Sequence, residues 1–392
     1  MGGLFVLRAG QVFDGERLIG RAAVMLEDGR VADVDTTGAP PPPAASVLDF
    51  GSDSFLMPGL IDAHVHLAFG ATADVVSPLV ELDDASLLTG MRVAGERALH
   101  AGVTTVRDLG DRGFLSLVLR ERGPRSGLPE ILASGPPLTP PGGHCHFLGG
   151  EAAGEVELHR AVRERAERGC EFVKVMVSGG ELGGGCPPYE SQYALASLRR
   201  IVEEAHRAGC RTAAHVHGPR AVSDSLAAGF DTLEHVTFLT SDGVEAEEAL
   251  VEQVAASARA VSVTVTSRPP GPSAGSPDAD EIERAILENH GRLWRAGARL
   301  VPGSDAGVSP DRPHDALPSC LSALVGGIGM IPEDALRAAT SVAAKSLGLA
   351  GRKGRITRGA DADVLVVRGD PMCDLGAVRD VLAVFRDGVR AR

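Results

Sequence analysis

The sequence predicts an α/β protein: a (β/α)8 TIM barrel with a small β-sandwich domain formed by both chain termini. Three observations lead to this fold. Eight short, β-branched apolar runs recur along the middle of the chain. Amphipathic stretches separate them, and both ends of the chain instead alternate short apolar runs with turns. We expect residues 1–57 and 345–392 to form the small β-rich domain, and residues 58–344 to form a catalytic barrel.

The eight runs have the length and composition of buried parallel strands. They cover residues 59–66, 103–108, 130–135, 172–177, 211–217, 232–236, 261–266 and 299–305. The segments between them include 156–168, 197–206 and 281–296, whose apolar residues recur at helical spacing. Strand and helix therefore alternate as a βα barrel requires.

The sequence pattern at both ends of the chain predicts β-strands. Residues 24–34 contain Asp28-Gly29 between two apolar runs, which is a strong hairpin signal. Residues 362–367 and 381–388 repeat this pattern near the carboxyl end. One small domain built from both ends is the simplest arrangement of these strands around a single barrel.

Composition limits the partners of the chain. Its 392 residues include 52 Asp and Glu against 39 Lys and Arg, a net charge of −13, which argues against nucleic acid and anionic membranes. No run of roughly 18 apolar residues and no secretory leader is visible. Six scattered cysteines without a Cys-x-x-Cys pair indicate reduced thiols. We expect a cytoplasmic protein that acts on a small molecule; homo-oligomers are common among such barrels, but the sequence identifies no interface.

Polar residues follow five of the predicted strands at their carboxyl ends, where a barrel gathers side chains around one pocket. Imidazoles with a carboxylate are typical ligands of divalent transition metals, most often zinc. Each residue alone is weak evidence, because single strand histidines are usually hydrogen-bonded core residues. Their co-occurrence predicts a metal site made of His64, His66, Lys174, His215, His217, His235 and Asp305.

Lys174 is the most diagnostic of these residues, because its neighbours from Phe172 to Val177 are all apolar. One interpretation is a lysine that extends to solvent from a strand edge. A barrel strand has no edge, however, and an isolated buried ammonium is costly. Burial favours the neutral amine, which can take up CO2 to give a carbamate, an anionic ligand able to bridge two metals.

The same residues resemble the amidohydrolase superfamily along nearly the whole chain. Residues 57–66 (MPGLIDAHVH) resemble its opening motif, and residues 172–180 resemble the carboxylated-lysine strand of binuclear members. Residues 232–235 (TLEH), 303–305 (GSD) and 359–366 (GADADVLV) match later strands of the family. Within the superfamily the chain looks most like the imidazolonepropionase-related group that contains prolidase-like metallopeptidases.

The resemblance implies a binuclear metal centre and a hydrolase acting on an amide bond. One ion would be held by His64, His66, N6-carboxylated Lys174 and Asp305, and the second by Lys174, His215 and His235. A metal-bridging hydroxide would attack the carbonyl of a dipeptide, N-acyl amino acid or cyclic amide. Asp305 would accept a proton and pass it to the departing amine.

Further residues are candidates for substrate contact. His144 follows the third strand and either contacts the substrate carbonyl or carboxylate or belongs to a hydrogen-bonded loop; Cys145 would point away if this segment is extended. His217 is either a substrate contact or a hydrogen-bonding partner of the centre, and whether it or His215 binds metal is open, with His215 favoured. The other substrate candidates are Tyr189, Tyr193, Arg268 and Arg312.

Other polar residues and loops have competing interpretations. Asp108 either orients a ligand histidine or caps a turn. The helical histidines 100, 159, 206 and 290 are predicted to be surface or packing residues, whereas His314 follows the eighth strand and could face the pocket. The Gly/Pro-rich loops 136–143, 178–188 and 268–280 should line the pocket mouth, with 268–280 the best candidate for a lid.

Two alternatives stay open. A mononuclear deaminase or imidazolonepropionase-like ring hydrolase could use the same barrel, but such deaminases usually have His-x-x-Glu after the fifth strand and lack the strand-four lysine. Here His215 is followed by Val216, His217 and Gly218, with no Glu. A metal-free scaffold is less favoured, because the ligand set is complete. About two, one or no metal ions per chain would separate the three hypotheses.

Overall fold

Eight parallel strands form the central part of the protein. The computed structural model describes residues 4–121, 127–257, 259–265 and 277–392. The strands are β8 (Leu60–Val65), β9 (Val103–Asp108), β10 (Glu130–Ala133), β11 (Phe172–Met176), β12 (Arg211–Val216), β13 (Thr232–His235), β16 (Ala260–Val263) and β17 (Arg299–Pro302). Seven of the eight predicted runs contain their strand, and β16 begins at Ala260, one residue before the predicted run 261–266.

These strands pair in chain order in two sheets. One sheet has the order β10-β9-β8, and the other has the order β11-β12-β13-β16-β17. Isolated parallel bridges join the sheets at both sides: Val65 pairs with Ala306 beyond β17, and Leu138 beyond β10 pairs with Val175 of β11. The carboxyl ends of all eight strands therefore lie on the same side of the molecule.

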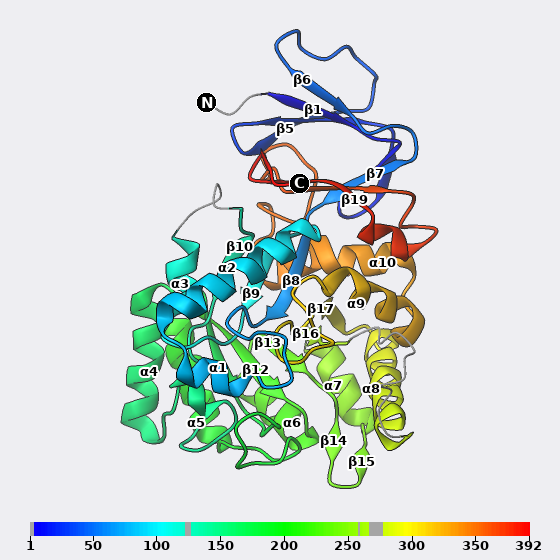
Figure 1. The fold of residues 1–392 in the computed structure, drawn as a ribbon. Coiled ribbons are helices and arrows are strands. Elements are labelled where there is room, and N and C mark those ends of the chain that lie inside the picture. Colours follow the sequence, from blue (N-terminus) through cyan, green and yellow to red (C-terminus); the bar gives the residue numbers. More distant parts are fainter. Residues whose placement is uncertain (1–3, 122–126, 258, 266–276) are drawn as a thin grey trace.

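Helices follow most of the strands and lie on their outer side (Figure 1). They are α1 (Val76–Glu81), α2 (Asp84–His100), α3 (Leu115–Arg120), α4 (Gly154–Arg168), α5 (Leu195–Arg207), α6 (Pro219–Ala228), α7 (Glu248–Ala256), α8 (Pro277–Arg295), α9 (Leu317–Ala323), α10 (Pro332–Arg337) and α11 (Ala343–Ser346). Short 3-10 helices cover His146–Leu148 and Leu375–Arg379, and short π-helices cover Leu324–Ile328 and Ala338–Val342. The three predicted helices correspond to α4, α5 and α8. Among the described residues, no helix is both long and apolar enough to cross a membrane.

Local chemistry explains where several helices begin and end. The Asp83 side chain accepts a hydrogen bond from the Ser86 amide (2.8 Å) and caps the start of α2. Helices α4 and α6 end at Gly169 and Gly229, whose φ angles of 89° and 90° are left-handed. Glycine adopts this conformation without the steric cost that a side chain would add.

Strands from both chain ends form two further sheets. The first has the order β5-β4-β1-β6 and the second β20-β19-β18-β7-β2-β3. Their strands are β1 (Phe5–Arg8), β2 (Gln11–Phe13), β3 (Leu18–Gly20), β4 (Ala23–Glu27), β5 (Arg30–Asp35), β6 (Ser46–Asp49), β7 (Ser54–Pro58), β18 (Val364–Arg368), β19 (Val381–Arg386) and β20 (Val389–Arg390). β7 pairs antiparallel with β18, so the amino- and carboxyl-terminal strands share one sheet. The expected Asp28-Gly29 turn joins β4 to β5.

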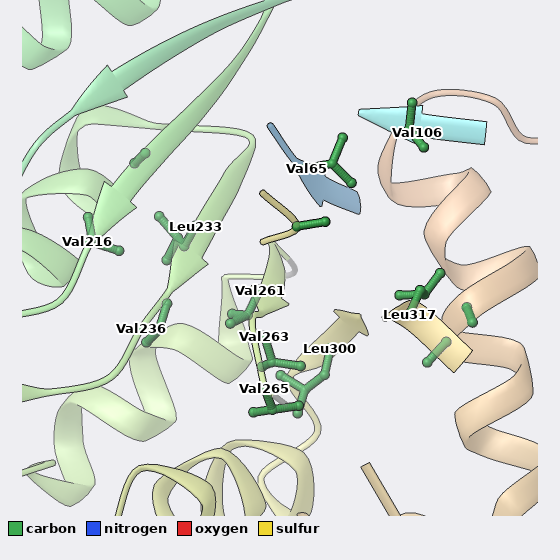
Figure 2. Close-up of a cluster of buried hydrophobic side chains, with 14 of the residues drawn as sticks. Val65, Val106, Val216, Leu233, Val236, Val261, Val263, Val265, Leu300 and Leu317 are labelled. Atoms are coloured by element: carbon green, nitrogen blue, oxygen red, sulfur yellow. The ribbon is translucent and has the colours of Figure 1, made fainter. Parts of the chain in front are cut away.

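Apolar residues fill the space inside both parts. Leu7, Val24, Leu56, Val364 and Phe385 are fully buried in one cluster that joins the two terminal sheets. A larger cluster packs the central strands against their helices, and Figure 2 shows Val106, Leu233, Val261, Leu300 and Leu317 within it. The close packing of these clusters holds the carboxyl ends of the central strands in place. The candidate site lies at those strand ends.

Candidate metal centre and active site

One cavity at the carboxyl ends of the strands brings most of the predicted polar residues together. Its volume is about 590 Å³, within the usual range for small-molecule sites. The predicted residues that line it are His64, His66, His144, Lys174, His215, His217, His235, Asp305 and Arg312. They come from strands far apart in the sequence, as a site at the end of a barrel requires.

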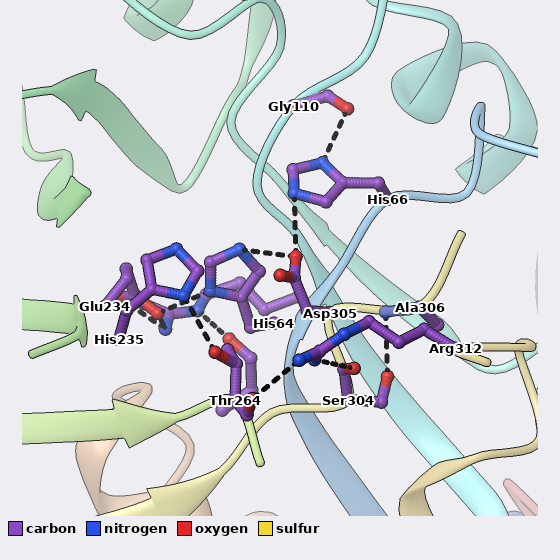
Figure 3. Close-up of polar contacts among 12 residues, drawn as sticks. His64, His66, Gly110, Glu234, His235, Thr264, Ser304, Asp305, Ala306 and Arg312 are labelled. Atoms are coloured by element: carbon purple, nitrogen blue, oxygen red, sulfur yellow. Dashed lines mark hydrogen bonds and ion pairs between the residues drawn. The ribbon is translucent and has the colours of Figure 1, made fainter. Parts of the chain in front are cut away.

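The first group of possible metal ligands is His64, His66 and Asp305. Both imidazole Nε2 atoms lie 3.4 Å from Asp305 Oδ1. Figure 3 marks both contacts with dashed lines. Asp305 has a left-handed backbone with φ 53°, and its amide donates to the His64 carbonyl at 2.8 Å. Such backbone is uncommon for a residue with a side chain and clusters at functional sites.

Hydrogen bonds fix which nitrogen of these imidazoles is free. His64 Nδ1 lies 2.9 Å from Glu234 Oε2, and His66 Nδ1 lies 3.1 Å from the Gly110 carbonyl. An ionised carboxylate and a carbonyl can only accept, so each Nδ1 carries the proton. The Nε2 lone pairs of both residues are left to face Asp305.

The second group is His215, His217 and His235, whose ligand atoms all lie within 4.8 Å of one another. His215 Nε2 donates to the Gly179 carbonyl at 3.1 Å, so its Nδ1 lone pair is free. His217 Nδ1 and His235 Nδ1 lie 2.9 Å and 2.8 Å from the hydroxyls of Thr237 and Thr264. Hydroxyls donate or accept, so these contacts do not fix the protons.

Burial keeps the imidazoles of His64, His215, His217 and His235 uncharged. It lowers the pKa of His64 to about 4 and that of His217 to about 3, and it holds the pKa values of His215 and His235 well below the ordinary one. Burial alone would raise the pKa of Asp305, but its electrostatic surroundings, among them the Arg312 guanidinium, hold that pKa well below the ordinary value and leave the carboxyl ionised. Neutral imidazoles beside a carboxylate are the protonation states that metal binding requires.

Lys174 lies in the same cavity and is only 1% exposed. Burial lowers the pKa of its amine to about 8, although Glu234 and Asp305 oppose this shift. Roughly a tenth of the amine is therefore neutral at pH 7, and the neutral amine is the form that reacts with CO2. The two ligand groups and this lysine together fit a pair of divalent transition metals.

The segment around His144 differs from the extended loop expected. Cys145 has a left-handed backbone (φ 58°), and a 3-10 turn begins at His146. Cys145 consequently lines the cavity, with its Sγ 3.5 Å from His144 Nε2, instead of pointing away. His144 Nδ1 donates to the Leu182 carbonyl at 3.0 Å, so its neutral ring offers Nε2 as an acceptor, not a donor for a substrate carbonyl.

The structure does not bring every candidate to the cavity. The Tyr193 hydroxyl donates to the Ala152 carbonyl at 2.8 Å, which makes Tyr193 a buried packing residue, and Tyr189 is not among the cavity residues. Arg312 lines the cavity but donates to the carbonyls of Ser304 and Thr264, so it ties two strand ends together. Arg268 and most of the suggested 268–280 lid lie outside the described residues.

Several neighbouring residues have structural roles. Asp108 caps a turn, because its carboxylate accepts from the amides of Leu67 and Gly110 and from the Ser116 hydroxyl. His314 Nε2 donates to the His66 carbonyl and does not line the cavity. His290 on α8 does line it, but its Nε2 donates to the carbonyls of His235 and Val236.

Sequence reasoning missed Arg107 and Glu234. Both are completely buried, and they form an ion pair behind His64 with N–O distances of 2.8 and 2.9 Å. The signal that singled out Lys174, a charge within a strand of mostly uncharged residues, is present at both positions. They lie deeper in the strands than the residues at the carboxyl ends.

Comparison with known proteins identifies the family of this chain. The amidohydrolase family matches residues 55–390. An ochratoxinase of Aspergillus niger is 28% identical over 362 residues, which cover 84% of this chain and 73% of the relative. An imidazolonepropionase of Salinispora arenicola is 27% identical over 371 residues, 88% of this chain and 85% of that one.

A solved structure of a prolidase complexed with N-methylphosphonate-L-proline is also similar. It is 26% identical and aligns over 99% of both chains with a TM-score of 0.84. The family match spans the central strands, all the ligand groups and the carboxyl-terminal strands. The chain therefore belongs to the amidohydrolase family and is a hydrolase acting on carbon–nitrogen bonds.

Proposed function

We propose that this enzyme hydrolyses the amide bond of a small molecule, such as a dipeptide, an N-acyl amino acid or a cyclic amide, with two zinc ions bound in the cavity. The observation that carries the proposal is that two groups of metal-ligand residues and a buried lysine line one cavity. A mononuclear enzyme would not need the lysine.

Each ion has its own ligands in this proposal. One ion would be held by His64, His66, Asp305 and N6-carboxylated Lys174, and the other by carboxylated Lys174 together with His215 and His235. The Gly179 carbonyl fixes the proton of His215 on Nε2, which favours His215 over His217 as the ligand. When bound, the ions supply an activated water and polarise the scissile carbonyl.

The chain's own groups handle the proton and the substrate. The ionised Asp305 carboxylate takes the proton released when water attacks, and passes it to the departing nitrogen. The unprotonated Nε2 of His144 accepts a hydrogen bond from a substrate N–H. Apolar residues also line the cavity and receive a nonpolar substituent: Phe69, Leu182, Leu239, Val265, Ile286 and Val308.

We also propose that the protein folds as a closed (β/α)8 barrel with a β-sandwich built from both termini. The two bridges between the parallel sheets support closure of the barrel, and the β7–β18 pairing supports the shared terminal domain. The limits proposed above, 1–57 with 345–392 and 58–344, place one junction before Pro58, the last residue of β7, and the other within α11.

A substrate screen tests the function. We expect protein purified with Zn²⁺ and bicarbonate to hydrolyse at least one class among X-Pro dipeptides, N-acyl amino acids, lactams and imidazolone rings. Removal of metal with a chelator should abolish turnover, and zinc should restore it. The similar prolidase, solved with N-methylphosphonate-L-proline, makes X-Pro dipeptides the first substrates to try. Deamination with one zinc per chain, or no zinc at all, would contradict the proposal.

A further inference from the structure

Glu234 is a carboxylate buried behind the metal ligands and outside the cavity. It is 0% exposed and lies on β13, next to His235, but its side chain contacts His64 of β8. We propose that Glu234 is a positioning residue: held by Arg107 and Thr232, it fixes the His64 ring so that Nε2 faces the metal. The inference rests on the proposed function, because it assumes that the cavity binds metal.

Four hydrogen bonds hold the Glu234 carboxylate in one orientation. Arg107 donates to both of its oxygens at 2.8 and 2.9 Å, and the Thr232 hydroxyl donates to Oε1 at 2.6 Å. The fourth bond comes from His64 Nδ1, which lies 2.9 Å from Oε2. With these partners the carboxylate has little freedom to rotate, so it can determine the plane of the His64 ring.

Arg107 makes an ionised Glu234 possible at this depth. Two buried charges are stable together only when they pair with good geometry and their remaining polar atoms are satisfied. Arg107 meets this condition, because its other nitrogens donate to the Ala63 carbonyl at 2.6 Å and to the Thr232 hydroxyl at 2.8 Å. Its guanidinium also lies 4.9 Å from the centre of the Phe172 ring.

The arrangement affects one ligand group and not the other. A carboxylate that accepts the Nδ1 proton sets the tautomer of His64 and makes its Nε2 a stronger donor to metal. In the second group, His215 pairs with a neutral carbonyl, and His217 and His235 pair with neutral hydroxyls. Loss of Glu234 should therefore weaken one zinc site selectively.

The test is a zinc titration of Glu234→Gln against a chromophoric chelator. The substitution keeps the shape of the side chain but removes its charge. We expect one of the two zinc ions to bind roughly 10- to 100-fold more weakly, as outer partners of metal ligands usually show. The absorption spectrum of the Co²⁺-substituted protein should change as well, which a general loss of stability would not cause.

Glu130→Gln is the matched control, because Glu130 also pairs with cations but contacts no cavity histidine. It should leave both zinc affinities unchanged. Thr232→Val removes one bond to Glu234 with little change of volume and should give a smaller loss in the same direction, even if Glu234→Gln does not fold. Wild-type zinc affinity and Co²⁺ spectra in Glu234→Gln, or in Thr232→Val should the first variant be unfolded, would overturn the inference. Failure of the wild-type protein to bind zinc would instead refute the proposed function.

Discussion

Lys174 gives the sharpest test at the scale of single residues. In Lys174→Ala the amine that would carry the carboxylate is gone, so we expect the loss of at least one zinc ion. Turnover should fall by about 100-fold or more, because the activated water depends on both ions. Metal analysis and initial rates measure these effects.

Lys345→Ala is the control for this variant. Lys345 lies exposed on α11, away from the cavity, and its loss should change neither zinc content nor rate. Intact mass spectrometry under mild conditions should show one added CO2 in the wild type and none in Lys174→Ala. Full zinc content and normal turnover in Lys174→Ala would rule out the carboxylated lysine.

Sequence reasoning succeeded for residues that sit on strands. Side chains two positions apart on a strand face the same side, so His64 and His66 could be placed together from their spacing alone. It failed for Cys145 and Tyr193, because a left-handed turn and a long-range hydrogen bond decide where those side chains lie. The Arg107–Glu234 pair joins strands whose residues are far apart in the sequence, and no local pattern contains that information.

At the scale of elements, α8 stabilises the end of β13. His290 on α8 donates from Nε2 to the carbonyls of His235 and Val236 at 2.8 and 3.2 Å. Both of those residues have left-handed backbones, with φ angles of 71° and 51°. We expect His290→Leu to lower the free energy of unfolding by roughly 1–3 kcal/mol, because two buried carbonyls lose their donor. Urea unfolding of the zinc-loaded protein measures the change.

The same substitution should weaken the zinc held by His235. His159→Leu on α4 removes an exposed histidine that pairs with Glu204 and should leave stability and zinc affinity close to wild type. If His290→Leu matched this control in both measurements, α8 would have no role in holding the strand end.

The presence of a strand or helix was easier to predict from the sequence than the residue at which it ends. The run predicted as 232–236 ends as a strand at His235, because the backbone becomes left-handed there. The two-residue strands β14 (Leu239–Thr240) and β15 (Gly243–Val244), and the six-residue α1, were not predicted. Elements this short are below the length at which hydrophobic periodicity is detectable.

At the scale of the whole molecule, a cluster of charges joins the central strands to the terminal sheets. Lys353 is 4% exposed, and its amine lies 3.0 Å from Glu130 of β10 and 3.1 Å from Asp361. Arg352 contacts the same two carboxylates. Glu130→Gln should cost about 3 kcal/mol at pH 7, because it leaves the buried Lys353 amine with one carboxylate fewer.

The stability lost in Glu130→Gln should depend on pH in a definite direction. Burial alone would raise the pKa of Glu130, but Arg352 and Lys353 lower it from 4.5 to about 2. A carboxyl with a depressed pKa stabilises the folded state above its unfolded value and loses that effect as the pH falls. The stability difference between wild type and Glu130→Gln should therefore shrink between pH 4.5 and pH 2. A difference that stayed constant or grew in acid would contradict this assignment.

The pattern of the chain ends predicts a shared domain, which stays a prediction, and the β7–β18 pairing shows a strand from each end in one sheet. The strand order within the two terminal sheets was not predictable, because short alternating strands pair equally well in several orders. The ion cluster was missed for a similar reason: Glu130 and Lys353 are ordinary charged residues at the ends of their segments, and only the fold brings them together.

The most direct test of the central claim is the zinc content of the wild-type protein purified with Zn²⁺ and bicarbonate. Two zinc ions per chain are expected, with turnover that disappears on chelation and returns as both ions are restored. One ion per chain with full activity, or no ion at all, would contradict a binuclear centre in this cavity.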